Sequence, residues 1–298
     1  MNLNNKASVV IHTYYRYNYL QTILELLLKQ TIKPKEVIIS DQTPIKDRPQ
    51  GFYESFKDLP LKVINLDRPM HAPAQNIGAR NSTGEILIFI DDDCEFREDF
   101  LEQHLRVMYE ENVDVVVGPN SPTWELPEYF TRDYRHSDPV SFFLKTIPAK
   151  WHGMVLYTIG GNTSIKREAF FDVNGYDEKM PRMADIELGF RLFKNGAKIY
   201  HSTKPFIHHL KGTSGGSHKA QKNLQYKRLL SWMYLYKKHF PGWGTQQFIL
   251  HEIMCAILFR EPISGFFKKG NLKNPFLPLV RIAQLIKACV ESNKLLNK

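Results

Sequence analysis

The sequence has few cysteines and no long hydrophobic runs. Its three cysteines, Cys94, Cys255 and Cys289, are too few and too scattered for a disulfide framework or a cysteine-based zinc site. This usage suggests a reducing, cytosolic environment. No internal repeat or low-complexity segment is evident, which argues against solenoid and disordered architectures.

No apolar run approaches the length that a membrane-spanning helix needs. The nearest, residues 248–259, is interrupted by His251 and Glu252. The polar residues 1–6 lead directly into an apolar segment, and no signal peptide is recognisable. We therefore expect a cytoplasmic protein that contacts the inner face of the cell membrane at most peripherally.

The composition is that of a soluble globular protein with an excess of positive charge. Hydrophobic residues make up 43% of the 298 residues and charged residues 24%, enough apolar material for a large core. The net charge of +9 favours anionic partners, which include nucleic acid, acidic membranes and phosphorylated substrates. Charge alone does not choose among them.

Strand and helix patterns alternate along the first half of the chain. Short β-branched runs predict strands at residues 7–13, 36–40, 61–66, 86–90 and 113–117. Apolar residues at helical spacing predict helices at 17–30, 73–82 and 97–111. This alternation indicates an α/β fold with a mostly parallel central sheet flanked by helices.

The later part of the chain is less regular. Residues 120–158 contain several prolines and aromatics, which in a compact domain indicates a functional or mobile segment. A helix is expected at 184–195, followed by short strands near Ile199 and Phe206. Basic, aromatic helices then replace the strands, so we expect a catalytic domain over 1–215 and a helical, basic extension over 216–298.

Three consecutive aspartates, Asp91, Asp92 and Asp93, follow the buried run that ends at Ile90. Such carboxylates repel one another, and a hard divalent cation with oxygen ligands is the usual compensation. The carboxyl ends of strands are also where open α/β sheets bind ligands. The alternative is that the aspartates only cap and solvate a turn.

Polar side chains also follow the first two predicted strands. Thr13, Tyr14 and Arg16 come after the first, and Asp41 ends the second. In a parallel sheet these strand ends converge on one edge. Asp41 could accept hydrogen bonds from a base or ribose, and Tyr14 could stack on a base. Together with a metal at the triplet, they predict a pocket for a nucleotide diphosphate.

Several segments, in their order and spacing, resemble family 2 inverting glycosyltransferases of the GT-A fold, as found in bacterial polysaccharide synthesis. They are residues 9–16, 37–41, 74–80, 84–93, 160–162, 167–168, 175–178, 185–191 and 209–216. The resemblance spans roughly residues 7–216. It implies transfer of a sugar from a nucleotide-diphosphate sugar to a hydroxyl of a glycan or lipid-linked glycan. Family frequency favours UDP, with GDP and dTDP as alternatives.

The resemblance also implies roles on the donor side. Asp93 is expected to bind Mn²⁺ or Mg²⁺ directly, and His209 to complete the coordination. Asp91 is expected to contact ribose or a metal-bound water. Asn76 and Asp92 belong to the expected donor-binding set, although Asp92 has no predicted role beyond solvation.

On the acceptor side, the resemblance makes Asp185 the base that removes the proton of the attacking hydroxyl. Its place in the first turn of a helix predicts a lowered pKa, because the helix dipole favours the carboxylate. The expected acceptor-side residues are Gly161, Asn162, Glu187 and Arg191. Arg191 lies four residues after Glu187, so the two can form an ion pair.

Three positions depart from the family pattern. Ala184 replaces a glutamate before the base, His12 replaces a proline after the first strand, and Gln75 replaces an arginine before Asn76. The last change removes a possible phosphate contact, which leaves donor affinity and identity open. None of the three removes the expected metal ligand or base.

The basic extension allows two interpretations. Lysines and aromatics alternate over 219–239 and again over 266–273. Basic amphipathic helices with exposed aromatics suit an anionic membrane surface. The simpler alternative is that the apolar residues pack on the catalytic domain and the lysines are solvated.

Three other functions remain as alternatives. A sugar-phosphate nucleotidyltransferase shares a related sheet but normally has a Gly-rich loop where this chain has Thr-Tyr-Tyr-Arg. A nucleic-acid-binding module fits the charge but lacks a recognition motif and leaves the acidic cluster unexplained, so we expect no nucleic-acid partner. A homologue that binds nucleotide sugars without activity is the third.

Overall fold

The computed structural model describes residues 2–121, 153–154, 157–210, 212, 224–257 and 277–297. They form two compact units, which we treat separately. The first holds the described residues of 2–121, 153–177 and 185–212, and the second holds 178–184 and the helices after residue 223. The predicted boundary at 215 and most of the irregular segment 120–158 lie outside the described residues.

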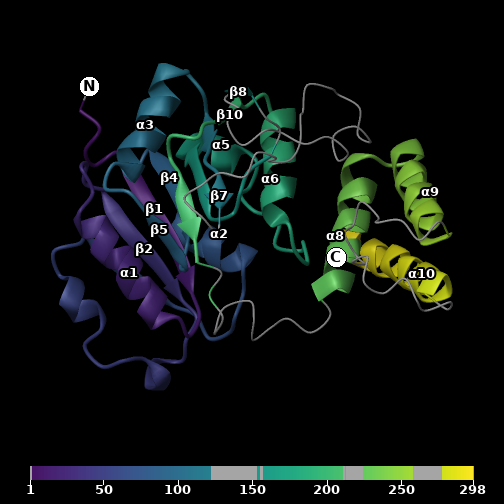
Figure 1. Cartoon of the computed structure of the whole chain (residues 1–298), viewed down its shortest axis with the longest axis horizontal. Helices are drawn as coiled ribbons and strands as arrows, with labels where there is room; N and C mark the ends of the chain where they lie inside the picture. Colours follow the sequence, from purple (N-terminus) through teal and green to yellow (C-terminus); the bar gives the residue numbers. More distant parts are fainter. Residues whose placement is uncertain are drawn as a thin grey trace. The chain divides into compact units, whose positions relative to one another are not determined.

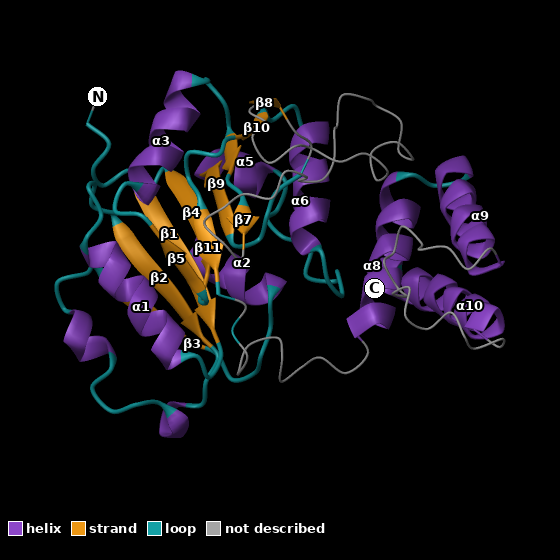
Figure 2. Cartoon of the chain, viewed as in Figure 1, coloured by secondary structure: helices purple, strands orange, loops and turns teal. Residues whose placement is uncertain are grey.

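The first unit is built on an eight-stranded sheet (Figure 2). The strand order is β3-β2-β1-β4-β9-β6-β10-β8. The strands are β1 (Ala7–Thr13), β2 (Glu36–Asp41), β3 (Leu61–Asn65), β4 (Ile86–Asp91), β6 (Val115–Val117), β8 (Gly153–Met154), β9 (Asn162–Lys166) and β10 (Ile199–His201). β3, β2, β1 and β4 are mutually parallel, whereas β9 runs antiparallel between β4 and β6. The predicted α/β fold with a mostly parallel sheet is confirmed.

Helices cover both faces of this sheet (Figure 1). On one face, α1 (Tyr17–Leu28) and α3 (Phe100–Glu110) contribute buried residues such as Leu24 and Leu105 to the main core. On the other face lie α2 (Ala72–Arg80) and α5 (Arg167–Asp172). There α2 approaches so closely that a Cβ on Gly78 would lie 2.6 Å from Val10 Cγ1. Short 3₁₀ turns span Ile45–Asp47 and Tyr53–Phe56, and α6 spans Ala184–Lys194.

A small second sheet brings distant segments to the end of β4. It consists of β5 (Cys94–Phe96), β11 (Ile207–His209) and β7 (Asn120–Ser121), in the order β5-β11-β7. The antiparallel pairing of β11 with β5 sets His209 opposite Cys94. His209 is therefore held directly beside the aspartate triplet.

The second unit contains the helices α8 (Leu224–His239), α9 (Trp243–Ile257) and α10 (Leu277–Leu296), each packed on the other two. The aromatics of the first of these helices are not exposed, as the membrane interpretation required: Trp232 and Tyr236 are buried, and Tyr236 stacks on Phe248 at 4.5 Å. These residues are buried because α8 packs on both α9 and α10. No helix in the described part of the chain is both long and apolar enough to cross a bilayer.

Candidate active site

Arg16 supplies the positive charge that the aspartate triplet requires. Its Nη1 lies 2.8 Å from Asp92 Oδ1 and 3.1 Å from Asp93 Oδ2, and all three side chains are buried. Arg16 reaches inward because Tyr15, with φ of 55°, turns the chain sharply just before it. That left-handed backbone is uncommon for a bulky residue. A hydrogen bond from the Tyr15 backbone N–H to Thr43 Oγ1, 2.9 Å, helps to hold it.

The Asp92 side chain is buried and bonded to protein groups. The prediction that it is solvated is therefore wrong. Its Oδ2 accepts a hydrogen bond from Thr13 Oγ1 at 2.8 Å, opposite the oxygen that faces Arg16. Burial raises the pKa of Asp92 to about 7, against the opposing effects of Arg16 and Thr13. Three predicted donor-binding residues are thus brought together, and they bond to one another.

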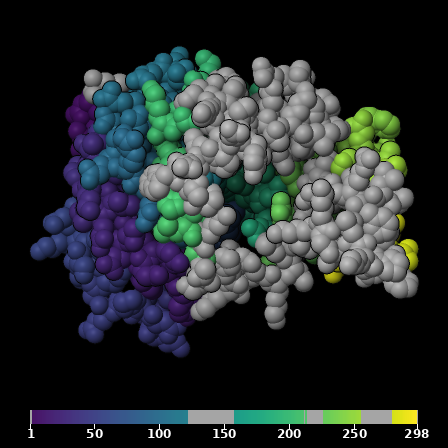
Figure 3. Space-filling model, viewed as in Figure 1, coloured from purple at the N-terminus to yellow at the C-terminus, as the bar shows by residue number. Residues whose placement is uncertain are grey.

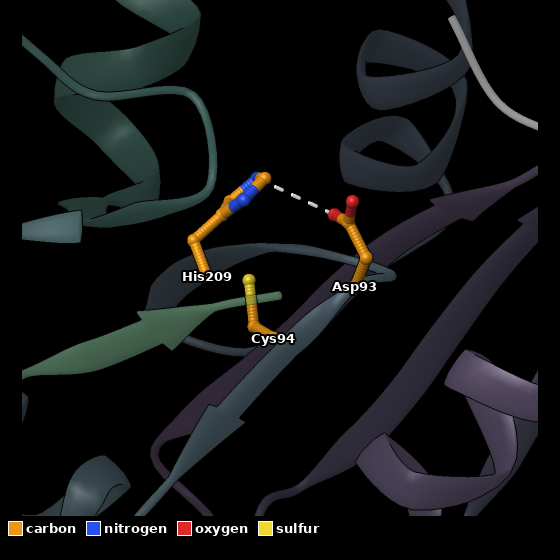
Figure 4. A group of neighbouring side chains, drawn as sticks. All are labelled: Asp93, Cys94 and His209. Atoms are coloured by element: carbon orange, nitrogen blue, oxygen red, sulfur yellow. Dashed lines mark ion pairs between the residues drawn. The ribbon is translucent and has the colours of Figure 1, made fainter. Parts of the chain in front are cut away.

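The carboxylate of Asp93 is oriented toward His209 (Figure 4). Its Oδ2 accepts a hydrogen bond from the backbone N–H of Gly212 at 2.9 Å and faces Arg16. Its Oδ1 lies 3.4 Å from His209 Nε2. One oxygen is therefore held by the protein while the other points at the imidazole.

Asp91 completes this cluster from the end of β4. Its Oδ2 lies 3.8 Å from His209 Nε2. Burial alone would raise the pKa of Asp91, but its interaction with His209 and the charges of His12 and His71 hold it at about 2. The interaction with Asp91 in turn raises the pKa of His209.

The donor atoms of this cluster fit a divalent cation. Asp93, Cys94 and His209 offer ligand atoms that all lie within 4.8 Å of one another (Figure 4). Burial raises the pKa of the Cys94 thiol well above its usual value, and sulfur is a softer ligand than Mn²⁺ and Mg²⁺ prefer. The remaining set, carboxylate oxygens from Asp93 and Asp91 with the imidazole of His209, suits Mn²⁺ or Mg²⁺.

Asp41 ends β2 beside β1, as predicted, but its carboxylate is enclosed by protein groups. Its Oδ2 accepts hydrogen bonds from the hydroxyls of Tyr17 and Tyr53, each 2.7 Å, and lies 3.2 Å from Arg48 Nε. The side chain is completely buried. Any contact of Asp41 with a nucleotide therefore competes with this internal network.

Tyr14 is half-buried beside Tyr15, with the two rings edge to face and their centroids 4.8 Å apart. It follows β1, as predicted, and lies at the edge of the sheet where Asp41 and Asp91 also end their strands. Its contact with a base remains a prediction.

Two consecutive glycines lie between the Asp91 carboxylate and Asp185. A Cβ on Gly161 would overlap Asp91 Oδ2, while a Cβ on Gly160 would lie 3.7 Å from Asp185 Oδ2. The backbone N–H of Gly160 also donates to Asp185 Oδ2 at 3.1 Å. Adjacent α-carbons are only about 3.8 Å apart, so the carboxylates of Asp91 and Asp185 flank a single dipeptide.

The pKa of Asp185 differs from the predicted direction. Burial raises it, although backbone N–H groups of Ile186 and Gly160 and the charge of His71 oppose the shift. The lowering expected from the helix N-terminus is therefore outweighed by desolvation. A carboxylate with a raised pKa is a stronger base, as proton abstraction from a hydroxyl requires.

His12 and His71 are site residues that the sequence did not reveal. His71 Nδ1 lies 2.9 Å from His12 Nε2, and the charge of His71 acts on both Asp91 and Asp185. In the sequence, His12 is only a position at which the family pattern has proline. Its pairing with Asp91 across β1 and β4 could have suggested a role. No local pattern around His71 indicates one.

Two predicted binding residues instead hold backbone segments in place. The Asn76 amide donates to Tyr176 O and accepts from Tyr176 N, both at 2.8 Å. Asn162, fully buried, donates to Pro119 O and Pro205 O, and its Oδ1 meets the ring of His104. Both amides fix the loops around the site.

The predicted ion pair between Glu187 and Arg191 is present. Arg191 Nη2 lies 2.7 Å from Glu187 Oε2, which is fully buried, and the same nitrogen donates to Gly175 O at 2.6 Å. The pair fastens α6 to the turn at Gly175, whose φ of 66° favours glycine. Direct contact of either side chain with an acceptor remains a prediction.

The glycine pair provides a matched test of this geometry. Gly161→Ala should displace the Asp91 carboxylate and lower turnover about tenfold or more, because positioning errors of that size are costly. Gly160→Ala meets only ordinary contact distances and should have a smaller effect. Steady-state kinetics with thermal melting would separate lost activity from lost folding; equal effects of the two changes would contradict the geometry.

The sequence matches the family model described as glycosyl transferase family 2 over residues 8–173, more than half of the chain. The chain belongs to glycosyl transferase family 2. This family assignment confirms the resemblance drawn from the strand-end motifs, and the matched region contains the aspartate triplet and both glycines.

Curated relatives carry glycosyltransferase and O-antigen biosynthesis names. A glucosyl-dolichyl phosphate glucuronosyltransferase of Haloferax volcanii is 30% identical over 192 residues, covering 60% of this chain and 58% of the relative. The O-antigen biosynthesis protein RfbC of Myxococcus xanthus is 25% identical over 231 residues, covering 68% of this chain. The chain spans 58% of the first relative's length and only 17% of the second's.

Solved structures with the same fold confirm the GT-A architecture. Residues 1–349 of S. aureus TarS, in complex with UDP-GlcNAc, superpose with a TM-score of 0.62 at 18% identity, covering 97% of this chain and 83% of that one. The mannosyltransferase PcManGT from Pyrobaculum calidifontis, in complex with GDP-Man and Mn²⁺, gives 0.58 at 15% identity, covering 99% and 79%. At these identities the likeness shows the fold alone.

Proposed function

We propose that this family 2 chain transfers a sugar from a nucleotide-diphosphate sugar to a hydroxyl acceptor, with inversion at the anomeric carbon. Asp185 acts as the base, and a divalent cation is held by Asp93 and His209, with Asp91 beside them. The observation that best supports the proposal is the Gly160–Gly161 dipeptide. Its two residues adjoin Asp185 and Asp91, so a base and an acidic cluster face one small region.

The donor side must stabilise the negative charge of the leaving diphosphate. A bound divalent cation supplies this stabilisation as a Lewis acid. Asp93 is suited to hold it because Gly212 and Arg16 fix one carboxylate oxygen and leave the other facing His209. Arg16 also offsets the negative charge of Asp92, which reduces the repulsion among the three aspartates before the donor binds.

The acceptor side must receive a proton as the hydroxyl attacks. The new bond forms between the acceptor oxygen and the anomeric carbon, the bond to the diphosphate breaks, and the proton passes to Asp185. The raised pKa of Asp185 favours that transfer. The backbone N–H of Gly160 keeps the carboxylate in position.

The identity of donor and acceptor is part of the proposal. Neighbours of the same fold were solved with UDP-GlcNAc and with GDP-Man, which supports a nucleotide-sugar donor, with UDP preferred by family frequency. The names of the relatives mention a dolichyl phosphate sugar and O-antigen biosynthesis. They favour a glycan or lipid-linked glycan as acceptor.

Thermal denaturation with a panel of nucleotide sugars, with and without Mn²⁺, tests the proposal. A fitting donor at about one hundred times its dissociation constant should raise the melting temperature by about 5–10 °C. The rise should shrink when EDTA replaces Mn²⁺. If no nucleotide sugar shifts the melting temperature in either condition, the proposed donor site is wrong; a shift without any turnover would indicate a binding protein.

A further inference from the structure

The outward faces of two helices in the second unit are apolar. On α9, Trp243, Leu250 and Met254 recur at intervals of seven and four residues and are exposed, Trp243 to 71% and Leu250 to 60%. The opposite face of α9, with Thr245 and Phe248, is buried. One exposed face of α9 therefore carries an apolar stripe.

α10 repeats this arrangement with lysines beside the stripe. Leu279, Ile286 and Val290 recur at intervals of seven and four residues, with Leu279 exposed to 66% and Ile286 to 61%. Lys287 and Lys294 are also exposed. Because each residue of an α-helix turns by about 100°, these two lysines lie about 60–80° around the helix axis from Leu279. Parts of α9 and α10, coloured yellow-green and yellow, reach the surface in Figure 3.

Single exposed apolar residues are ordinary, whereas several along one face of a helix indicate an interaction surface. We define the α9–α10 face as Trp243, Leu250, Met254, Leu279, Ile286 and Val290. α9 and α10 pack on each other, so the two stripes belong to one small unit.

The charge of the three helices favours an anionic partner. Their described residues contain seven lysines and arginines, four on α8 and three on α10, against two acidic residues, Glu252 and Glu291. Of the three on α10, Arg281 is buried, whereas Lys287 and Lys294 are exposed. Glu252 is buried, and Glu291 accepts a hydrogen bond from Tyr226 at 2.7 Å and lies 3.8 Å from Lys287. A second copy of the same unit would bring like charges together, so an acidic surface is the better match.

We propose that the α9–α10 face binds an anionic lipid bilayer, with the apolar stripes in the headgroup region and the lysines on lipid phosphates. Trp243 suits this position because an indole combines apolar area with a polar N–H. Shallow insertion of an apolar face together with basic residues gives reversible, salt-sensitive binding. The face differs from the one considered in the membrane interpretation of the sequence, whose aromatics on α8 are buried.

Vesicle flotation of the full chain tests this directly. The protein should float with vesicles of phosphatidylcholine mixed with phosphatidylglycerol, bind phosphatidylcholine alone at least about tenfold more weakly, and dissociate as salt rises. The double change Leu250→Gln with Ile286→Gln should weaken binding by about tenfold or more, since each removes a large apolar side chain from the bilayer. Lys287→Gln with Lys294→Gln should weaken binding to the vesicles that contain phosphatidylglycerol and leave binding to phosphatidylcholine alone unchanged.

Ile45→Gln is the matched control, because Ile45 is exposed to 69% on a short 3₁₀ turn of the first unit. It should leave flotation unchanged, and circular dichroism should show all variants folded. The proposal is overturned if the full chain floats with neither vesicle type, or if Ile45→Gln weakens binding as much as the α9–α10 changes. It is also overturned if sedimentation shows self-association that Leu250→Gln with Ile286→Gln abolishes, because the partner is then a second copy.

Discussion

Replacing Asp185 with Asn should lower kcat by about a hundred- to ten-thousand-fold, the range that a positioned general base contributes. The amide oxygen of Asn can still accept the hydrogen bond from the backbone N–H of Gly160, so the turn should keep its shape. The affinity for nucleotide and metal, measured by calorimetry, should stay within about twofold of wild type. Retention of most turnover would mean that Asp185 is not the base.

The pH dependence gives an independent readout of the same residue. A base must be deprotonated, and burial raises the pKa of Asp185 above its ordinary value. Turnover of the wild type should therefore fall as the pH drops through that raised pKa. The residual activity of Asp185→Asn should lack this limb of the profile, whereas a purely structural role would lower activity equally at every pH.

Removing the carboxylate of Asp93 should have a comparable effect on turnover for a different reason. Asp93→Ala takes away the oxygen that faces His209, and with it the proposed metal ligand of lowest exposure. We expect kcat/KM to fall by about a thousandfold, because charge stabilisation of the leaving diphosphate is worth several kcal/mol. Nucleotide-sugar binding should also lose most of its dependence on Mn²⁺.

Two further changes make the Asp93 result interpretable. Asp93→Asn keeps the shape of the side chain and can still receive the hydrogen bond from Gly212, so it tests charge rather than folding. Asp172→Ala, at the exposed end of α5, is a matched carboxylate removal outside the site and should change neither binding nor turnover. Unchanged Mn²⁺ dependence in both Asp93 variants would remove Asp93 from the metal site.

Much of the sheet was predictable because its central strands are buried on both faces. The continuous apolar runs of β1, β2 and β4 left little choice of structure, and the register opposes Thr13 to Asp41 and His12 to Asp91, as converging strand ends require. β9 was missed because Asn162, Thr163 and Ser164 look like loop residues. They are buried by their place between β4 and β6, not by composition.

The partners within the site were harder to predict than its members. Arg16 and Asp92 are 76 residues apart, and no local spacing links them. The strand-end pattern brought Thr13, Asp41 and Asp91 to one edge but could not show that Tyr17 and Tyr53 enclose Asp41. The raised pKa of Asp185 depends on burial, which the sequence alone did not give.

The stereochemistry of transfer tests the central claim most directly. The purified chain would be incubated with the α-linked nucleotide sugar that gives the largest thermal shift, and proton NMR would follow the first product formed, including the sugar released to water. Direct displacement assisted by Asp185 predicts a β-configured product before any mutarotation. An α-configured first product would contradict the account, because retention requires a different arrangement of catalytic groups from the single base proposed here.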